Sequence, residues 1–238
     1  MNYSAETYDA YEQSFAIDAS AAARTAFIQR TYLHVAGAIA AFALLFAGLY
    51  TLVPAQTMIN IFGNAGMLVF LVVFIGGSYL SQYLVRADHS IPVQYMGLGL
   101  YIVLEALIFW PLLVVVQWKT GTLNVVYQAA ILTGALAGGL TVAAFVTKKD
   151  FSFLGPIVGI GCLAALGLII IAMIFGINLG LFFSFAMVAL MSAAILYSAS
   201  NVMYHYRTDQ HVGAALYIFS AVMTLFYYII RILMSSRD

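Results

Sequence analysis

The sequence predicts an all-α integral membrane protein, a bundle of seven transmembrane helices, and two observations lead to this fold class. Of the 238 residues, 64% are hydrophobic and only 8% are charged, whereas a soluble domain carries about 25% charged residues. So little charge cannot cover a surface that faces water. In addition, seven apolar stretches are each long enough to cross a bilayer, which takes roughly 20 helical residues. The lipid bilayer is therefore the first expected partner.

The first element is a polar tail over residues 1–23. It contains four acidic residues and no basic residue, whereas a secretory signal begins with positive charge and continues into an apolar core. We therefore expect a flexible tail that is not a cleaved signal, followed by a membrane domain over residues 24–238.

Seven apolar stretches follow the tail, and polar or glycine-containing segments separate them. The stretches lie at about 31–53, 66–85, 94–116, 124–147, 153–175, 179–203 and 212–234. The last one contains Thr224 and three tyrosines, so it is less apolar than the others. We expect it to cross the membrane fully, with a re-entrant hairpin as the alternative.

Basic residues predict which end of the bundle faces the cytoplasm, because short cytoplasmic loops carry an excess of Lys and Arg. With seven spans and a cytoplasmic N-terminus, six of the nine basic residues lie on the cytoplasmic side: Arg24, Arg30, Arg86, Lys148, Lys149 and Arg207. The other three, Lys119, Arg231 and Arg237, lie on the far side. An even number of spans would raise the ratio to eight against one, which favours the hairpin alternative.

Small residues recur at helical spacing in two of the stretches. Gly134 and Gly138 form one such set, and Gly155, Gly159 and Cys162 form the other. Small residues let membrane helices approach each other closely. We therefore interpret both sets as positions of helix packing.

Composition and motifs give no support to several other classes of protein. The net charge is zero, so nothing favours a nucleic-acid partner. Gly138 and Gly139 are not followed by Lys and Ser or Thr, so they do not form a phosphate-binding loop. The four histidines lack metal-ligand spacing, and no Ser–His–Asp or paired-acid arrangement is visible. We therefore expect no catalytic residues, no metal and no cofactor.

Glu105 is an acid in the middle of the stretch 94–116, eleven residues from either end. An ionised carboxylate at that depth costs at least about 2.5–3.5 kcal/mol, so an unpaired Glu105 is expected to be protonated. Its role is either structural, as a neutral donor to Ser198, Tyr197 or a backbone carbonyl, or functional, as a proton or cation site beside a cavity. Pro111 is expected to kink the helix just past it.

Arg86 and Arg207 lie in polar loops on the predicted cytoplasmic side. Long basic side chains near helix ends extend toward the head groups, so both residues are expected to anchor the bundle. The alternative is a cytoplasmic gate in which they pair with Asp88 or Asp209.

Five stretches in the right order resemble the Bax inhibitor-1 family, and the resemblance covers roughly residues 24–238. They are RTYLHVAGAIAAF (30–42), LEALIFWPLL (104–113), FVTKKDFSFLG (145–155), AAILYSASNVM (193–203) and ALYIFSAVMTLFYYIIRIL (215–233). In the second of these, Ala106 stands where the family has glycine. The segment TKKDFSFLG is similar to that of the bacterial members that modulate the membrane protease FtsH, the YccA type.

The resemblance implies six helices around a central seventh and one of two activities. Some bacterial members are pH-sensitive Ca²⁺ leak channels in which one Asp on the sixth helix and one on the seventh share protons. Here Ser198 stands at the first position and Ala221 at the second, or Phe219 if the alignment is anchored on the preceding Leu-Tyr. Neither serine nor alanine can share a proton in this way.

The missing acids favour the second activity that the resemblance implies. The expected function is that of a bacterial inner-membrane protein that binds an FtsH-type protease and restrains its proteolysis. A Ca²⁺ or proton leak that uses Glu105 as its inner acid is the alternative.

Overall fold

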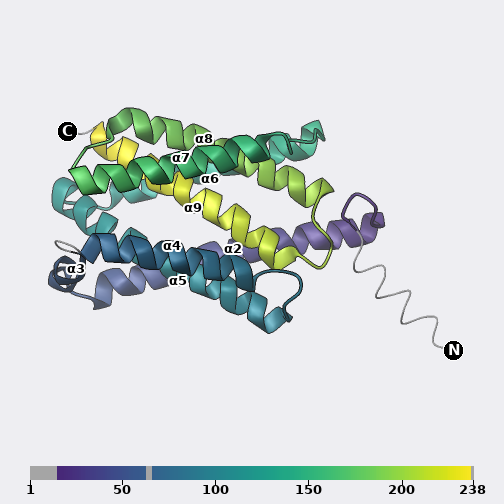
Figure 1. Cartoon of the computed structure of the whole chain (residues 1–238), viewed down its shortest axis with the longest axis horizontal. Helices are drawn as coiled ribbons and strands as arrows, with labels where there is room; N and C mark the ends of the chain where they lie inside the picture. Colours follow the sequence, from purple (N-terminus) through teal and green to yellow (C-terminus); the bar gives the residue numbers. More distant parts are fainter. Residues whose placement is uncertain (1–14, 63–65, 237–238) are drawn as a thin grey trace.

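The computed structural model describes residues 15–62 and 66–236, and within them the chain is helical, with no strand longer than an isolated β-bridge. Seven long helices and one short helix follow each other along the chain (Figure 1). They are α2 (Ala21–Leu52), α3 (Ala55–Phe62), α4 (Gly66–Leu84), α5 (Ile91–Thr120), α6 (Asn124–Thr147), α7 (Leu154–Phe175), α8 (Gly180–Tyr204) and α9 (His211–Ser235).

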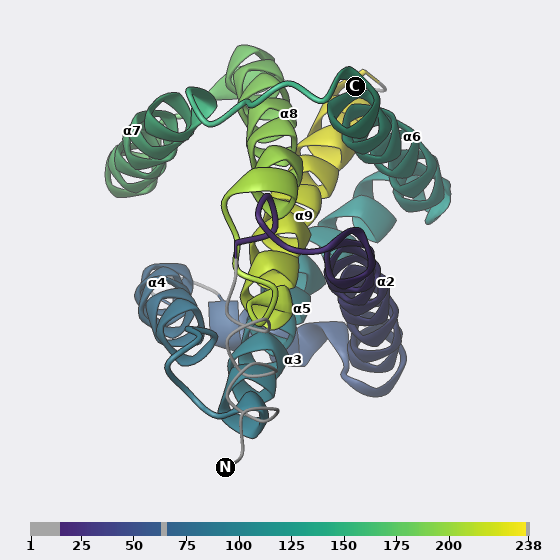
Figure 2. The ribbon, with the colours of Figure 1, turned by 90° about the vertical axis from the view of Figure 1, so that its right-hand side faces the viewer.

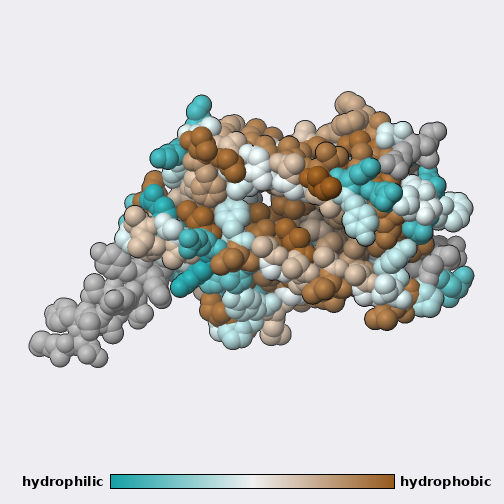
Figure 3. Space-filling model, turned by 180° about the vertical axis from the view of Figure 1, so that it is seen from behind, coloured by the Kyte–Doolittle hydropathy of each residue, from teal (hydrophilic) through white to brown (hydrophobic). Residues whose placement is uncertain are grey.

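Six of the described helices are long and apolar enough to cross a membrane, namely α2, α5, α6, α7, α8 and α9. The apolar part of α4, Val69–Leu84, is shorter. Large apolar side chains such as Leu44, Ile131 and Val142 are exposed on the outside of the bundle. Figure 3 shows the face behind that of Figure 1, where hydrophobic residues cover most of the surface and the strongly hydrophilic ones gather toward its two ends. The chain is therefore a multi-pass membrane protein.

Helix α9 occupies the centre of the bundle (Figure 2). It packs against α2, α5, α6 and α8, and it contains more buried residues than any other helix. It is one unbroken helix of 25 residues, so the re-entrant hairpin considered for this segment is not formed.

Helices α4 and α7 are held differently from the rest. Helix α4 packs mainly on α5, and α7 packs on α8. Figures 1 and 2 show α4 and α7 on either side of α9, on the same flank of the bundle. Helices α4 and α7 therefore each depend on one main neighbour and do not pack closely on each other.

Of the small residues expected at helix contacts, only Gly155 lies at a close contact between two helices. A Cβ atom on Gly155 would lie 2.9 Å from the Tyr197 ring of α8, so this glycine brings α7 close to α8. Gly134, Gly138 and Gly159 have nothing within 4 Å of such an atom, and Cys162 is exposed. The packing interpretation is therefore wrong for these three glycines, because they do not face another helix closely.

The segment before α2 has a defined structure from Phe15 onward. The Ala16 N–H donates to the Tyr206 carbonyl over 2.8 Å, and the Arg24 guanidinium donates to the carbonyls of Ala16 and Ile17. Residues 15–23 of the tail that was expected to be flexible are thus bound to the loop after α8, or already helical. Residues 1–14 lie outside the described part of the chain.

Candidate functional site: a cavity with one buried acid

A cavity of about 1020 Å³ lies among α4, α5, α7, α8 and α9, on the flank where α4 and α7 stand apart. Most of its lining is apolar, and polar side chains from α4, α5, α8 and α9 interrupt it. The polar ones include Ser78, Gln82, Tyr101, Glu105, Ser198, Asn201, Ser220, Thr224 and Arg231.

Glu105 lies in the wall of this cavity and is 3% exposed. The interior side of α5 places it there together with Tyr101, which is one turn earlier and interacts with its carboxyl group. Tyr101 also meets Ser220 of α9. The neighbour of Glu105 is therefore on its own helix. Tyr197 and Ser198, the partners considered from the sequence, line the same cavity.

Ser198 and Ala221 both line this cavity, and both are buried. Phe219, the other residue considered for the second position, is fully buried and is not part of the lining. The two positions that the resemblance assigns to paired acids thus face the same space as Glu105. Among the residues that line it, Glu105 is the only carboxylic acid.

Arg86 and Arg207 lie at the end of the bundle where α4, α6 and α8 end. Arg86 lines a smaller pocket of about 290 Å³ that shares Gln82 and Tyr217 with the larger cavity, and its guanidinium lies over the Tyr83 ring, 5.9 Å from the centroid. Arg207 pairs with Asp209 at 2.7 Å. Because that pair joins two residues of one loop, it does not by itself tie one helix to another.

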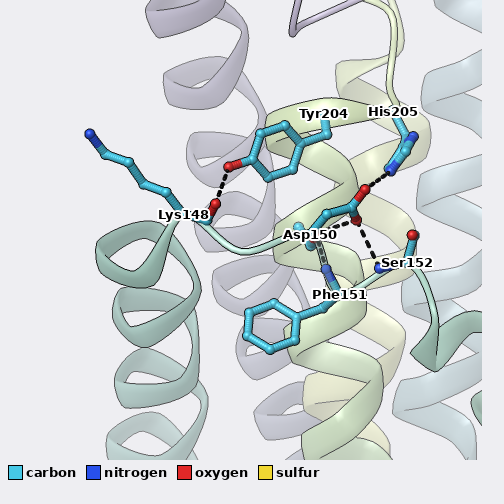
Figure 4. Close-up of polar contacts among 7 residues, drawn as sticks. Lys148, Asp150, Phe151, Ser152, Tyr204 and His205 are labelled. Carbon is cyan, nitrogen blue, oxygen red and sulfur yellow. Dashed lines mark hydrogen bonds and ion pairs between the residues drawn. The ribbon is translucent and has the colours of Figure 1, made fainter.

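The loop between α6 and α7 is fastened to the end of α8 through Asp150 (Figure 4). The Asp150 carboxylate accepts from the Ser152 N–H at 2.9 Å, faces His205 Nε2 at 3.0 Å, and accepts from the Ser200 hydroxyl at 3.3 Å. The bond from the Ser152 backbone, followed by the interaction with His205, holds the pKa of Asp150 below its usual range.

Two further bonds complete this contact. The Ser200 hydroxyl, which is fully buried, accepts from the Phe151 N–H at 2.8 Å, and the Tyr204 hydroxyl donates to the carbonyl of Lys148 at 2.7 Å. Lys148 has φ of 50° and ends α6 in the left-handed conformation. Because Ser200 and His205 both bind the carboxylate, the three groups do not form a nucleophile–base relay, and their arrangement fixes the loop.

The four histidines are all near this same end, but they do not converge on one point. His34 contacts the Tyr95 hydroxyl at 2.7 Å, and its ring lies 5.0 Å from that of His211. His205 binds Asp150, and His89 packs on Tyr83. Within residues 15–62 and 66–236, no group of three or more His, Cys, Asp or Glu is arranged to hold a metal ion.

Comparisons with known proteins agree with the resemblance in the sequence. A family model described as "Inhibitor of apoptosis-promoting Bax1" (Bax1-I) matches residues 24–238. Protein LIFEGUARD 4 of Arabidopsis thaliana is 26% identical over 176 residues, which cover 68% of this chain and 66% of that relative. The chain thus spans about two thirds of the length of this plant protein.

Proposed function

Because this chain belongs to the Bax inhibitor-1 family, we propose that it is a regulator in the bacterial inner membrane that binds an FtsH-type protease and restrains its degradation of membrane substrates. In this proposal it has no catalytic step and needs no cofactor. Its N-terminus and the loops that contain Arg86, Lys148 and Arg207 face the cytoplasm.

The observation that carries the proposal is the single acid in the central cavity. A pH-controlled leak of the kind that the resemblance describes needs two carboxyl groups close enough to compete for a proton. Ser198 and Ala221 occupy those two positions, and Glu105 has a tyrosine as its neighbour. Of the two activities considered from the sequence, protease regulation is the one that does not require the missing pair.

The N-terminal segment supplies a means of engaging a protease. Phe15 and Ala16 are bound to the loop after α8, at the end of the bundle that we propose to be cytoplasmic. Glu6, Asp9 and Glu12 precede this attachment point. A cytoplasmic protease would therefore encounter an acidic segment that is followed by residues bound to the loop after α8.

The proposal is tested by isolating the full chain from bacterial membranes together with an FtsH-type protease. The degradation of a membrane substrate is then measured in vesicles that contain both proteins. We expect co-purification and slower degradation with the intact chain, and faster degradation when residues 2–14 are deleted. A variant with Glu6, Asp9 and Glu12 changed to Gln or Asn keeps the length and isolates the role of charge. Absence of co-purification together with unchanged degradation would contradict the proposal.

The alternative is a Ca²⁺ or proton leak, and the position of Glu105 is the observation that favours it. This acid lies beside a cavity that shares residues with the pocket at the proposed cytoplasmic end. Purified protein in vesicles loaded with a calcium dye, assayed from pH 6 to 8, tests it. Flux that Glu105→Gln abolishes supports the leak, equal flux from both proteins removes Glu105 from it, and no flux at any pH removes the leak itself.

A further inference from the structure

The cavity has a side opening toward the bilayer. Its lining includes residues of α4, such as Phe70 and Phe74, and residues of α7, such as Gly159 and Leu163, and the two helices pack on different neighbours. Leu163 is 68% exposed although it lines the cavity. It therefore lies at the rim, where the cavity meets the lipid-facing surface.

The apolar part of the cavity lining favours bilayer lipid over water. Apolar side chains, among them Phe70, Phe74, Ile108 and Met187, line it between its scattered polar groups. A water molecule needs two to four polar partners to be held in a protein, so water can be held beside the polar side chains of the lining but not along its apolar stretches. The acyl chains of the surrounding membrane, in contrast, are adjacent to the opening and match the lining.

Arg231 places a positive charge in the same cavity. It lies one turn before the end of α9 and is half-buried. Its guanidinium lies 5.9 Å from the centroid of the Tyr228 ring, and among the described residues no carboxylate forms an ion pair with it. A guanidinium binds phosphate through two parallel hydrogen bonds.

From these observations we propose that the cavity binds one anionic phospholipid of the bilayer, with its phosphate group at Arg231 and an acyl chain between α4 and α7. The head group lies near the end of α9, where α5 and α7 also end, and the chain extends toward the level of Glu105. This binding site does not depend on whether the protein regulates a protease or conducts an ion.

Head-group selection is tested by native mass spectrometry of the purified full chain. The protein is equilibrated with mixed micelles that contain equal amounts of phosphatidylglycerol and phosphatidylcholine with identical acyl chains. We expect one retained phosphatidylglycerol, and about fivefold weaker retention in Arg231→Gln, because one basic residue near a membrane surface contributes about that factor. Arg231→Lys keeps the charge and should retain most of the preference. Lys119→Gln, which removes an exposed cation from the same end of the bundle, should have no effect.

Occupation of the cavity by the chain is tested with two glycine substitutions. Gly159 lines the cavity, and an added Cβ would have nothing within 4 Å, so Gly159→Phe is expected to reduce the space of the cavity without a clash at its Cβ. Gly134→Phe is the matched control, because Gly134 has equally open surroundings on α6, away from the cavity. We expect Gly159→Phe to reduce retention of phosphatidylglycerol and Gly134→Phe to leave it unchanged.

Three results would overturn the proposal: equal retention of the two lipids by the unaltered chain, retention that Arg231→Gln leaves unchanged, or retention that Gly159→Phe leaves unchanged. The thermal midpoint of each variant is measured in parallel. If Arg231→Gln does not fold, the comparison of Arg231→Lys with the unaltered chain and the pair of glycine variants still decides the outcome.

Discussion

Ser200 shows how much of the loop geometry can depend on one hydroxyl group. It is fully buried, it accepts from the Phe151 N–H, and it donates to the Asp150 carboxylate. Within a buried site, a backbone N–H that loses its acceptor costs about 1–3 kcal/mol. The Ser200 hydroxyl is therefore expected to stabilise the protein more than a serine hydroxyl that bonds only within its own helix.

We predict that Ser200→Ala destabilises the protein by about 1–2 kcal/mol, because Phe151 N–H and Asp150 both lose a partner. The measurement is the midpoint of thermal unfolding in detergent. Ser192→Ala is the control, since Ser192 only donates to the carbonyl of Val188 in its own helix and its loss should be close to neutral. Equal midpoints for the two variants would contradict this account of the loop.

Asp150 makes the same loop sensitive to acid. Its pKa is lowered, first by the Ser152 N–H and then by His205, so the folded state favours the ionised carboxylate. The resulting stabilisation is complete above the ordinary pKa of an aspartate, and it disappears as the pH falls through the lowered value. We predict lower protection of residues 148–154 at acidic pH, where protection is the exchange rate of an unstructured chain at the same pH divided by the measured rate, determined by mass spectrometry. Asp150→Asn should show low protection at every pH, and protection that does not change with pH in the unaltered chain would refute the prediction.

At the scale of the element, α7 depends on its contact with α8 for its position. Gly155 lies so close to the Tyr197 ring that a side chain there must displace it. Gly167 is on the same helix and has nothing within 4 Å of an added Cβ. The two glycines therefore separate the effect of helix propensity from that of packing.

We predict that Gly155→Leu lowers the thermal midpoint, whereas Gly167→Leu leaves it unchanged or raises it slightly, because leucine favours a helix over glycine by up to about 1 kcal/mol. Overpacking of a close contact typically costs about 1–3 kcal/mol. Thermal unfolding of the two variants side by side is the measurement. A larger loss from Gly167→Leu would mean that α7 does not pack on α8 through Gly155.

The apolar stretches predicted the bounds of some helices closely and missed the beginning of another. The stretches 124–147 and 153–175 agree with α6 and α7 to within one residue. The first stretch begins at residue 31, whereas α2 begins at Ala21. The difference arises because the Ser20 hydroxyl caps α2 and accepts from the Ala23 N–H, and helix geometry continues through polar residues that an apolar window leaves out.

Part of the candidate site could be predicted from the sequence, and the rest depends on contacts between residues that are far apart in the chain. Glu105 was found because a lone acid in an apolar stretch is conspicuous. Its partner Tyr101 is four residues earlier, and spacing of this kind places two side chains on one face of a helix, so the sequence contained that signal. The contact of Asp150 with His205 joins residues that are 55 positions apart, and no local pattern encodes it.

At the scale of the whole molecule, charge distinguishes the two ends of the bundle. Six basic residues lie at the end that holds the loops after α4, α6 and α8, and they include Arg86, Lys148 and Arg207. Lys119 and Arg231 lie toward the other end. Because α9 is unbroken, its last turn lies at the opposite end from its first residue.

We predict that a reporter fused after Asp238 is outside the cytoplasm, because basic loops stay inside. In a bacterial host, alkaline phosphatase at this position should be active and a green fluorescent protein should be dark. The same reporters fused after Thr208, in the loop before α9, should give the reverse pattern. Fluorescence from the fusion after Asp238 would contradict the predicted orientation.

The central position of α9 has a consequence for how the protein is made. This helix leaves the ribosome only after α2, α5, α6 and α8 have been synthesised, yet it is the one that all four pack against. Until it is inserted, α2 can pack on α5 and α6 on α8, but no helix contacts all four. The polar groups around Glu105 then lack one wall of their cavity. We therefore expect the helices of a newly made chain to stay incompletely packed until α9 is inserted. A stalled translation product that lacks α9 should be degraded by membrane quality control.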